Sequence, residues 1–505
     1  MRKRFGSDVL CCAEVGPVRA WVARLVVSAC LPLLAAGSVA PAHAQELDRF
    51  LEECTGTGAE EIHEDESRFS DECKPLAIVP ERPRAILELG DPFLGTGTLG
   101  RGFTLPTGAV WQPSLLVYGT FLAAVQGREV QQTGAGFREI PARANLFANL
   151  FLTPTERVVI GIRPLDQNGA FTGYTLQARP IGSLPEEFKS ELNATIRTLF
   201  FEGDLGEIFP NLDRDDSRGF DVYFSVGRQP LAFQDGLLIN EDMVDMVGLT
   251  RANLKIGGLI NTRVTGVFGW GGITRHSVLG NQNDDSAKMF GLFTEIDTRS
   301  STFELDVLYV AGDAASGKGI HGGIGVTGRL GRFNNTLRVL GSAPIGNVTE
   351  FNSSGVLIHE QFSWTPHGGI NLAYITAYAG IGQFRSAARG PLVGGPLGRT
   401  GILWASAGLG RFGPPLGNQS DDSFGGAVGY QMFFDDTRKQ LVLEAGARRH
   451  SKGVGRAGTD LVGIGGRYQI AMGRHWVLTF AAARTRDLIA DLDVTAARAE
   501  LLLKL

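Results

Sequence analysis

The sequence predicts an all-β protein: a transmembrane antiparallel β-barrel of about 18 strands with a short N-terminal periplasmic extension. Apolar and polar side chains alternate with a period of two over about 400 residues, which is typical of barrel strands. The last predicted strand, residues 493–505, shows the pattern to its end. Its apolar face carries Ala497, Ala499, Leu501, Leu503 and Leu505. Its other face carries Arg498, Glu500 and Lys504. In a membrane barrel the apolar face contacts lipid and the charged face contacts water in the lumen.

The N-terminal region has the features of an export signal, and the sequence predicts a signal peptide over residues 1–44. Basic residues precede an apolar run over residues 25–40, and an A-x-A cleavage pattern ends at Ala44. A lipobox at Val27-Ser-Ala-Cys30 is an alternative interpretation of this region. No later segment has the roughly 18 uninterrupted apolar residues of a membrane helix. Because only helices and closed barrels satisfy the backbone in lipid, a closed barrel is the remaining membrane fold.

Residues 45–105 are the predicted periplasmic extension, which is strongly acidic at its start. Residues 45–92 hold 14 acidic and 5 basic side chains. This charge argues against nucleic acid as a partner and allows a periplasmic protein to dock there. Cys54 and Cys73 are the cysteines that remain after signal cleavage, and in an exported chain they favour one disulfide. Two free thiols or a metal-binding pair are the alternatives.

The predicted barrel, residues 106–505, consists of hairpins with short turns between longer links. Residues 143–152 and 157–163 flank one such turn, at Thr153-Pro-Thr-Glu156. Further hairpins join residues 289–297 with 301–310, 325–332 with 334–340, 356–364 with 370–379, 425–434 with 440–450, and 461–470 with 475–485. The long links are 164–193, 203–218, 229–246, 276–287, 381–399, 409–423 and 451–458. Short turns fit the periplasmic end, and long links fit outer loops that fold inward to narrow a pore.

A soluble β-sandwich or propeller is the alternative fold. Such a fold would bury the apolar face of each strand in a core and would use shorter strands. Alternation on a single face over roughly ten residues per strand favours the membrane barrel.

Strand parity places a set of arginines on the inward face of the barrel. They are Arg143, Arg157, Arg163, Arg197, Arg263, Arg329, Arg338, Arg448, Arg467 and Arg498, together with Lys255 and Lys504. Fewer acids face inward by the same parity: Asp221, Glu295, Asp297, Glu304, Asp306, Glu444 and Glu500. Because guanidinium groups stay charged and match the geometry of carboxylates, an arginine-rich lumen suits anionic solutes. The alternative is that these charges pair across neighbouring strands and only make the lumen wall hydrophilic.

Residues 219–251 contain a distinctive stretch in which a strand reaches Gly227-Arg228-Gln229 and an irregular segment with Gly236 follows. Over Val226–Gly236 this stretch resembles the strand-to-loop pattern of alginate-export-type outer-membrane proteins and related porins. The resemblance implies a monomeric barrel of about 18 strands, with a basic lumen that passes anionic polysaccharide or small acids. It also implies that Arg228 and Gln229 lie near a constriction. The chain departs from common barrels in ending at Leu505 rather than at an aromatic residue, and its acidic extension is not part of the family pattern.

The sequence therefore predicts a channel of the bacterial outer membrane, which contacts membrane lipid and passes small anionic solutes or anionic polysaccharide. A scaffold barrel that anchors or sheathes a periplasmic partner through residues 45–92 is the alternative. An outer-membrane hydrolase is a third class, but no Ser/His pair stands in a recognisable hydrolase setting, so we predict no enzyme. No Walker loop, zinc motif or nucleotide fingerprint occurs, so we predict no cofactor and no metal.

Overall fold

The computed structural model describes residues 82–93, 102–179, 186–212, 221–366, 369–435, 437–451 and 460–505. Arg82–Leu505 form one compact unit. The predicted signal peptide, the extension up to residue 81, and the predicted disulfide between Cys54 and Cys73 lie outside the described residues. The boundary at residue 105 and the disulfide therefore stay predictions.

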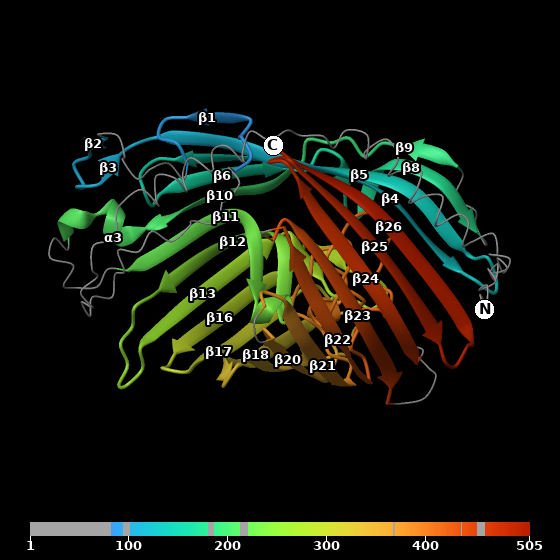
Figure 1. Ribbon diagram of the computed structural model, residues 1–505. Coiled ribbons are helices and arrows are strands. Elements are labelled where there is room, and N and C mark those ends of the chain that lie inside the picture. The colour runs from blue at the N-terminus through green and yellow to red at the C-terminus, as the bar shows by residue number, and fades with distance from the viewer. Residues whose placement is uncertain are drawn as a thin grey trace, which may run out of the picture. The chain divides into compact units, whose positions relative to one another are not determined.

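The described chain forms a closed antiparallel barrel of 18 strands, as predicted. The last strand pairs with the first, from Val494 opposite Val130 to Lys504 opposite Thr120. Figure 1 shows the strands around the barrel. They are β4 Ser114–Val130, β5 Gly136–Phe151, β6 Arg157–Ile162, β10 Ile196–Asp204, β11 Val222–Phe233, β12 Ile239–Arg251, β13 Asn261–Gly271, β16 Lys288–Asp297, β17 Ser301–Ala311, β18 Lys318–Leu330, β19 Phe333–Ile345, β20 Gly355–Trp364, β21 Leu372–Gly382, β22 Ser423–Phe434, β23 Lys439–His450, β24 Leu461–Met472, β25 Trp476–Asp487 and β26 Leu492–Lys504.

Short elements extend the wall or fill its links. Strand β1 (Leu87–Leu89) pairs with the start of β4, and β8 (Ala170–Arg179) pairs with the first half of β5. The other short strands are β2 Phe103–Thr104, β3 Val110–Trp111, β7 Asp166–Gln167, β9 Glu187–Lys189, β14 Ile273–Arg275 and β15 Gln282–Asp284. The described helical turns are α3 Leu205–Ile208, η1 Pro210–Leu212, η2 Gln234–Gly236 and η3 Pro396–Arg399. Among the described residues, no helix has the length and apolar character needed to cross a membrane.

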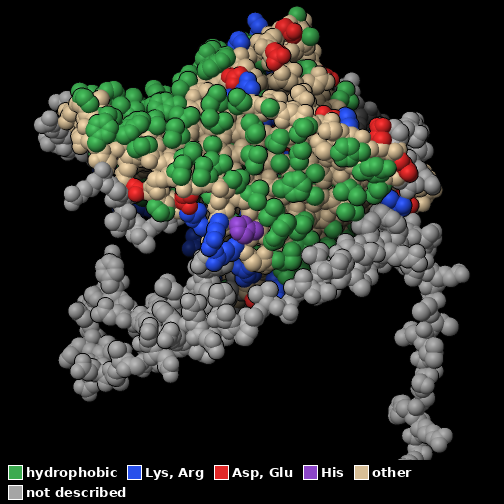
Figure 2. Space-filling model, turned by 90° about the horizontal axis from the view of Figure 1, so that it is seen from above, with side chains coloured by type: hydrophobic (Ala, Val, Ile, Leu, Met, Phe, Trp, Pro, Cys, Tyr) green, Lys and Arg blue, Asp and Glu red, His purple; other side chains and the backbone are tan. Residues whose placement is uncertain are grey.

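The outer face of the barrel is apolar because the strands alternate as predicted. In β17, Phe303, Leu305 and Val307 are exposed on the outside, whereas Glu304 and Asp306 point into the barrel and line a cavity there. Hydrophobic side chains are spread widely over the described surface that faces the viewer in Figure 2. An apolar exterior on a closed barrel places the protein in the bacterial outer membrane.

The predicted link at 229–246 is wrong, because most of it is strand. Strand β11 continues to Phe233 and β12 begins at Ile239, which leaves only residues 234–238 as a turn. Asn and Asp side chains in this region favour a loop, yet the backbones of Asn240 and Asp245 pair with β11. Ala232 lies opposite Asn240, and Arg228 lies opposite Asp245.

The interior of the barrel is partly apolar. Inward side chains of β12 to β22 include a buried apolar set that forms one core inside the barrel. Leu308 and Val310 of β17, for example, face inward and are fully buried. They are buried because residues 383–422, between β21 and β22, fold into the lumen and supply the other half of this core. We call residues 383–422 the inserted segment.

Candidate channel constriction

The inserted segment is held in the barrel mainly by apolar packing. Phe384, Leu397, Leu403, Trp404 and Leu416 are fully buried. Trp404 packs edge-on against Tyr378 of β21, with ring centroids 5.2 Å apart. Burial of these large side chains removes apolar surface from water, which stabilises the packed position of the segment. The segment therefore has a fixed position in the barrel. Figure 1 shows it in orange inside the ring of strands.

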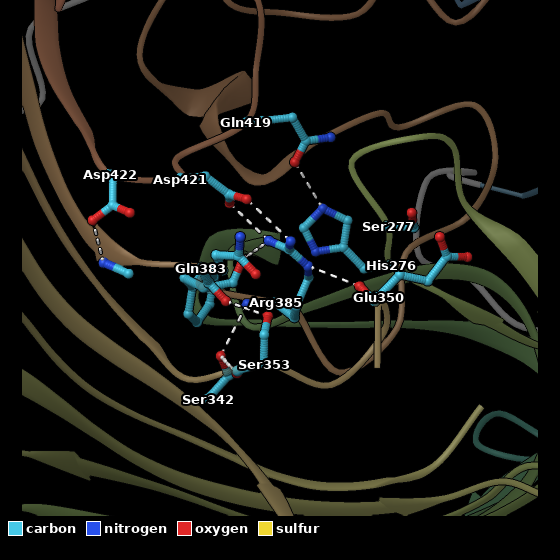
Figure 3. Close-up of polar contacts among 12 residues, drawn as sticks. His276, Ser277, Ser342, Glu350, Ser353, Gln383, Arg385, Gln419, Asp421 and Asp422 are labelled. Carbon is cyan, nitrogen blue, oxygen red and sulfur yellow. Dashed lines mark hydrogen bonds and ion pairs between the residues drawn. The ribbon is translucent and has the colours of Figure 1, made fainter. Parts of the chain in front are cut away.

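An ion pair closes the base of the inserted segment. Arg385 donates to both carboxylate oxygens of Asp421, over 2.7 and 3.0 Å, and so joins the two ends of the segment. Its Nε donates to the backbone oxygen of Glu350 at 3.0 Å, and its backbone N–H donates to Ser342 Oγ at 3.0 Å. Figure 3 shows these contacts converging on Arg385. The bidentate geometry is the strong form of this interaction.

His276 lies beside this base and connects it to the link after β14. The backbone N–H of Ser386 donates to His276 Nδ1 at 2.9 Å, so the proton of a neutral ring is on Nε2. His276 Nε2 then donates to Gln419 Oε1, also at 2.9 Å (Figure 3). Burial, reinforced by the charges of Arg389 and Arg385, holds the pKa of His276 well below its usual 6.5.

We expect His276 to make the attachment of the inserted segment sensitive to acid. Because the pKa is lower in the folded state, the neutral ring contributes stability above about pH 6.5 that is lost as pH falls toward the folded-state pKa. Thermal unfolding of the detergent-solubilised protein between pH 8 and pH 5 measures this loss. His276→Asn keeps a donor and an acceptor but does not titrate. We expect this variant to reduce the fall in Tm between pH 8 and pH 5 by roughly 2–4 °C. Identical slopes for both proteins would contradict the assignment.

Further hydrogen bonds tie the inserted segment to distant parts of the wall. Glu444 of β23 accepts from the backbone N–H groups of Ile402 and Leu403, each at 2.9 Å. Arg143 of β5 donates to the Gly408 oxygen at 2.7 Å, and Gln126 of β4 donates to the Leu409 oxygen at 2.9 Å. The segment thus reaches from one side of the barrel to another and divides the lumen.

Two cavities flank the inserted segment inside the barrel. The larger, of about 650 Å³, lies between the segment, the η2 turn and strands β13, β16 and β17. The smaller, of about 200 Å³, lies between the segment and strands β24, β25 and β26. Ala405 and Ser406 line both cavities, so the same stretch of backbone separates them. These cavities are where a passing solute would meet protein side chains.

Four of the predicted lumen arginines form ion pairs, as the pairing interpretation expects. Arg228 meets Asp245 at 2.7 Å, and Arg263 meets Glu295 at 2.5 Å. Arg338 meets Asp235 at 2.8 Å and Glu304 at 3.2 Å, and Arg163 meets Asp242. Gln229 donates to Ser225 Oγ of its own strand at 3.0 Å. The charges of these arginines are therefore compensated locally.

Four other predicted lumen arginines have no carboxylate within 4.0 Å among the described residues. They are Arg143, Arg197, Arg448 and Arg467. Arg197 and Arg448 donate to backbone oxygens instead, of Asp166 and Leu416, each at 3.4 Å. Arg467 lines the smaller cavity together with Arg498. Arg329 stands apart from both cavities, exposed near the end of β18.

Sequence reasoning missed the charged residues of the inserted segment. Arg385 and Arg389 lie in a link with no strand periodicity, so parity could not assign them a face. One signal was present in the wall instead. Residues 307–310, Val-Leu-Tyr-Val, are apolar on both faces of a strand, which indicates that something apolar packs inside the barrel. Among the described residues, no group of His, Cys, Asp or Glu side chains is arranged to hold a metal ion.

Comparison with solved structures identifies the architecture. A BenF-like porin from Pseudomonas fluorescens Pf-5 aligns over 77% of this chain and 98% of its own, with 10% identity and a TM-score of 0.53. Pseudomonas aeruginosa OccK11 (OpdR) aligns over 77% and 96%, with 11% identity and a TM-score of 0.49. Pseudomonas aeruginosa OccK5 (OpdH) aligns over 77% and 98%, with 10% identity and a TM-score of 0.48. No protein-family model and no curated protein matches the chain. At such identities the similarity is one of fold, the outer-membrane porin barrel.

Proposed function

We propose that the protein is a passive outer-membrane channel for small solutes that carry anionic groups. The observation that supports this most is a closed barrel narrowed by a packed segment, with the guanidinium group of Arg467, which forms no ion pair among the described residues, beside the narrowing. A porin-like fold is consistent with a channel. Solutes would pass the inserted segment through the cavities on its two sides.

The charge preference follows from the arginines without carboxylate partners. A fixed positive charge in a confined, low-dielectric lumen attracts anions more strongly than it would in water. Arg448 and Arg467 supply such charges from β23 and β24, whereas the charges of Arg143 and Arg197 are partly offset by the nearby Asp166 and Asp242. We assign a smaller share to the paired Arg163, Arg228, Arg263 and Arg338, and to Arg329 at the strand end. Gln229 would add a neutral hydrogen-bonding group near Arg228.

The size of the cavities favours small solutes over a polysaccharide. The smaller cavity holds about 200 Å³, and the inserted segment bonds to β4, β5 and β23 across the lumen. A polymer chain would need a continuous opening past this segment. The resemblance to alginate-export-type proteins covers only Val226–Gly236, so anionic polysaccharide stays the alternative cargo.

The test of anion preference is the reversal potential of single channels under a salt gradient. We expect Arg467→Gln to shift the reversal potential toward cations, because it removes an uncompensated charge beside the inserted segment. The control is the double variant Arg157→Gln with Glu202→Gln, which removes an ion pair of 2.5 Å and leaves the net charge of the lumen unchanged. Equal reversal potentials for Arg467→Gln and the wild type would remove Arg467 from the selectivity filter.

A further inference from the structure

The larger cavity is lined by charges of both signs, and most of them are paired. Arg263 pairs with Glu295, and Glu304 pairs with Arg338 behind it. Asp235 also pairs with Arg338, at 2.8 Å. Arg399 of the inserted segment lies 4.0 Å from the same carboxylate of Asp235. Two charged residues of the lining are left without an ion pair: Asp306 from the wall and Arg389 from the inserted segment.

Asp306 is a carboxylate that receives only neutral donors. Gln234 Nε2 donates to its Oδ2 at 2.7 Å, and the backbone N–H of Thr294 donates to its Oδ1 at 3.3 Å. No Lys or Arg side chain among the described residues lies within ion-pair distance of it. Because a carboxylate has about four acceptor positions, Asp306 has capacity for a further, charged donor from the cavity.

Arg389 of the inserted segment is a guanidinium whose hydrogen bonds likewise go to neutral groups. Its Nε donates to the Gly394 oxygen at 2.9 Å, and its Nη1 donates to the Gly236 oxygen at 2.5 Å. Both acceptors are neutral carbonyls, and the side chain is almost fully buried. Burial lowers the pKa of this guanidinium to about 9, so it still carries its charge at neutral pH. The charge of the nearby Glu241 acts on Arg389, but the two side chains form no ion pair among the described residues. A buried guanidinium without an ion-pair partner favours an anionic group of a ligand at this point.

An aromatic surface lies beside these two charges. Phe233 and Phe293 stack with their ring centroids 3.5 Å apart and their planes within 8°. Both side chains line the cavity, and Phe293 is buried behind Phe233. Ring faces attract apolar bodies and ammonium groups alike.

We propose that the larger cavity binds a small zwitterion, with its carboxylate at Arg389 and its ammonium at Asp306. This inference rests on the proposed channel function and names the class of solute that the route selects. A simple anion would satisfy Arg389 but would face the uncompensated Asp306. A simple cation would meet the reverse problem. A solute that carries both groups compensates both residues, and an apolar body between them contacts Phe233.

Three probes with the same phenylethyl group test this proposal on the full-length protein in planar bilayers. They are phenylalanine, 3-phenylpropanoate, which lacks the ammonium, and 2-phenylethylamine, which lacks the carboxylate. Binding is measured from the frequency and duration of current interruptions. We expect phenylalanine to bind about tenfold more tightly than either analogue, because each analogue loses one charge-assisted hydrogen bond. Equal or tighter binding of 3-phenylpropanoate to the wild-type channel would overturn the proposal.

A variant pair locates the preference within the cavity. Asp306→Asn is expected to weaken phenylalanine about tenfold while 3-phenylpropanoate binds equally well or better. Glu202→Gln is the matched control, since it removes one lumen carboxylate of β10 that does not line this cavity. Loss of the phenylalanine preference in both variants alike would overturn the role of Asp306. A wild-type channel with no conductance or with cation preference would instead contradict the proposed function itself, so the two failures are distinguishable.

Discussion

Replacing Trp404 with alanine is expected to raise single-channel conductance and current noise several-fold. Trp404 is fully buried at the centre of the core between the inserted segment and the wall. Truncation of a buried tryptophan costs about 3–5 kcal/mol, and here most of that cost falls on the attachment of the inserted segment. A segment that detaches transiently opens the lumen that it divides.

The control for Trp404→Ala is Trp270→Ala. Trp270 lies on the outer face of β13 and is exposed to lipid, so its loss leaves the lumen unchanged. Both variants are compared with the wild type in planar bilayers after each has been shown to fold as a barrel in detergent. Wild-type conductance and noise in Trp404→Ala would show that the segment does not limit the current.

Replacing Arg385 with methionine is expected to destabilise the inserted segment by about 3–5 kcal/mol, because it leaves the carboxylate of Asp421 without its partner. The two side chains are mostly buried, at 3% and 15% exposed. Denaturant unfolding followed by Trp fluorescence measures the change. We expect the double variant Arg385→Met with Asp421→Leu to recover part of the loss, because both charges are then absent. If the loss of stability in the double variant equals the sum of the losses in Arg385→Met and Asp421→Leu, the ion pair itself contributes nothing to stability.

Most of the wall could be predicted from the sequence, because lipid imposes one simple rule on it. Leu337 and Val339 face lipid while Arg338 between them faces inward, and parity alone assigns all three. The predicted hairpin of residues 289–297 and 301–310 corresponds to β16 and β17 for the same reason. The rule depends only on the local backbone, so it holds without knowledge of the rest of the fold.

The constriction could not be predicted in this way, because its contacts join residues far apart in the sequence. Arg389 meets the backbone of Gly236, and Glu444 meets that of Leu403. Parity placed Arg263 and Arg467 both on the inward face, yet it could not show that Glu295 compensates one and that no described carboxylate pairs with the other. Those pairings depend on the register between strands and on the path of the inserted segment.

The most direct test of the channel proposal is single-channel recording of the wild-type protein in a planar bilayer under a salt gradient. The account predicts small, steady currents whose reversal potential shows anion preference, as a narrowed lumen with uncompensated arginines requires. A folded barrel that conducts no ions would contradict the account and would favour the scaffold alternative. A channel that prefers cations would contradict the role assigned to Arg448 and Arg467.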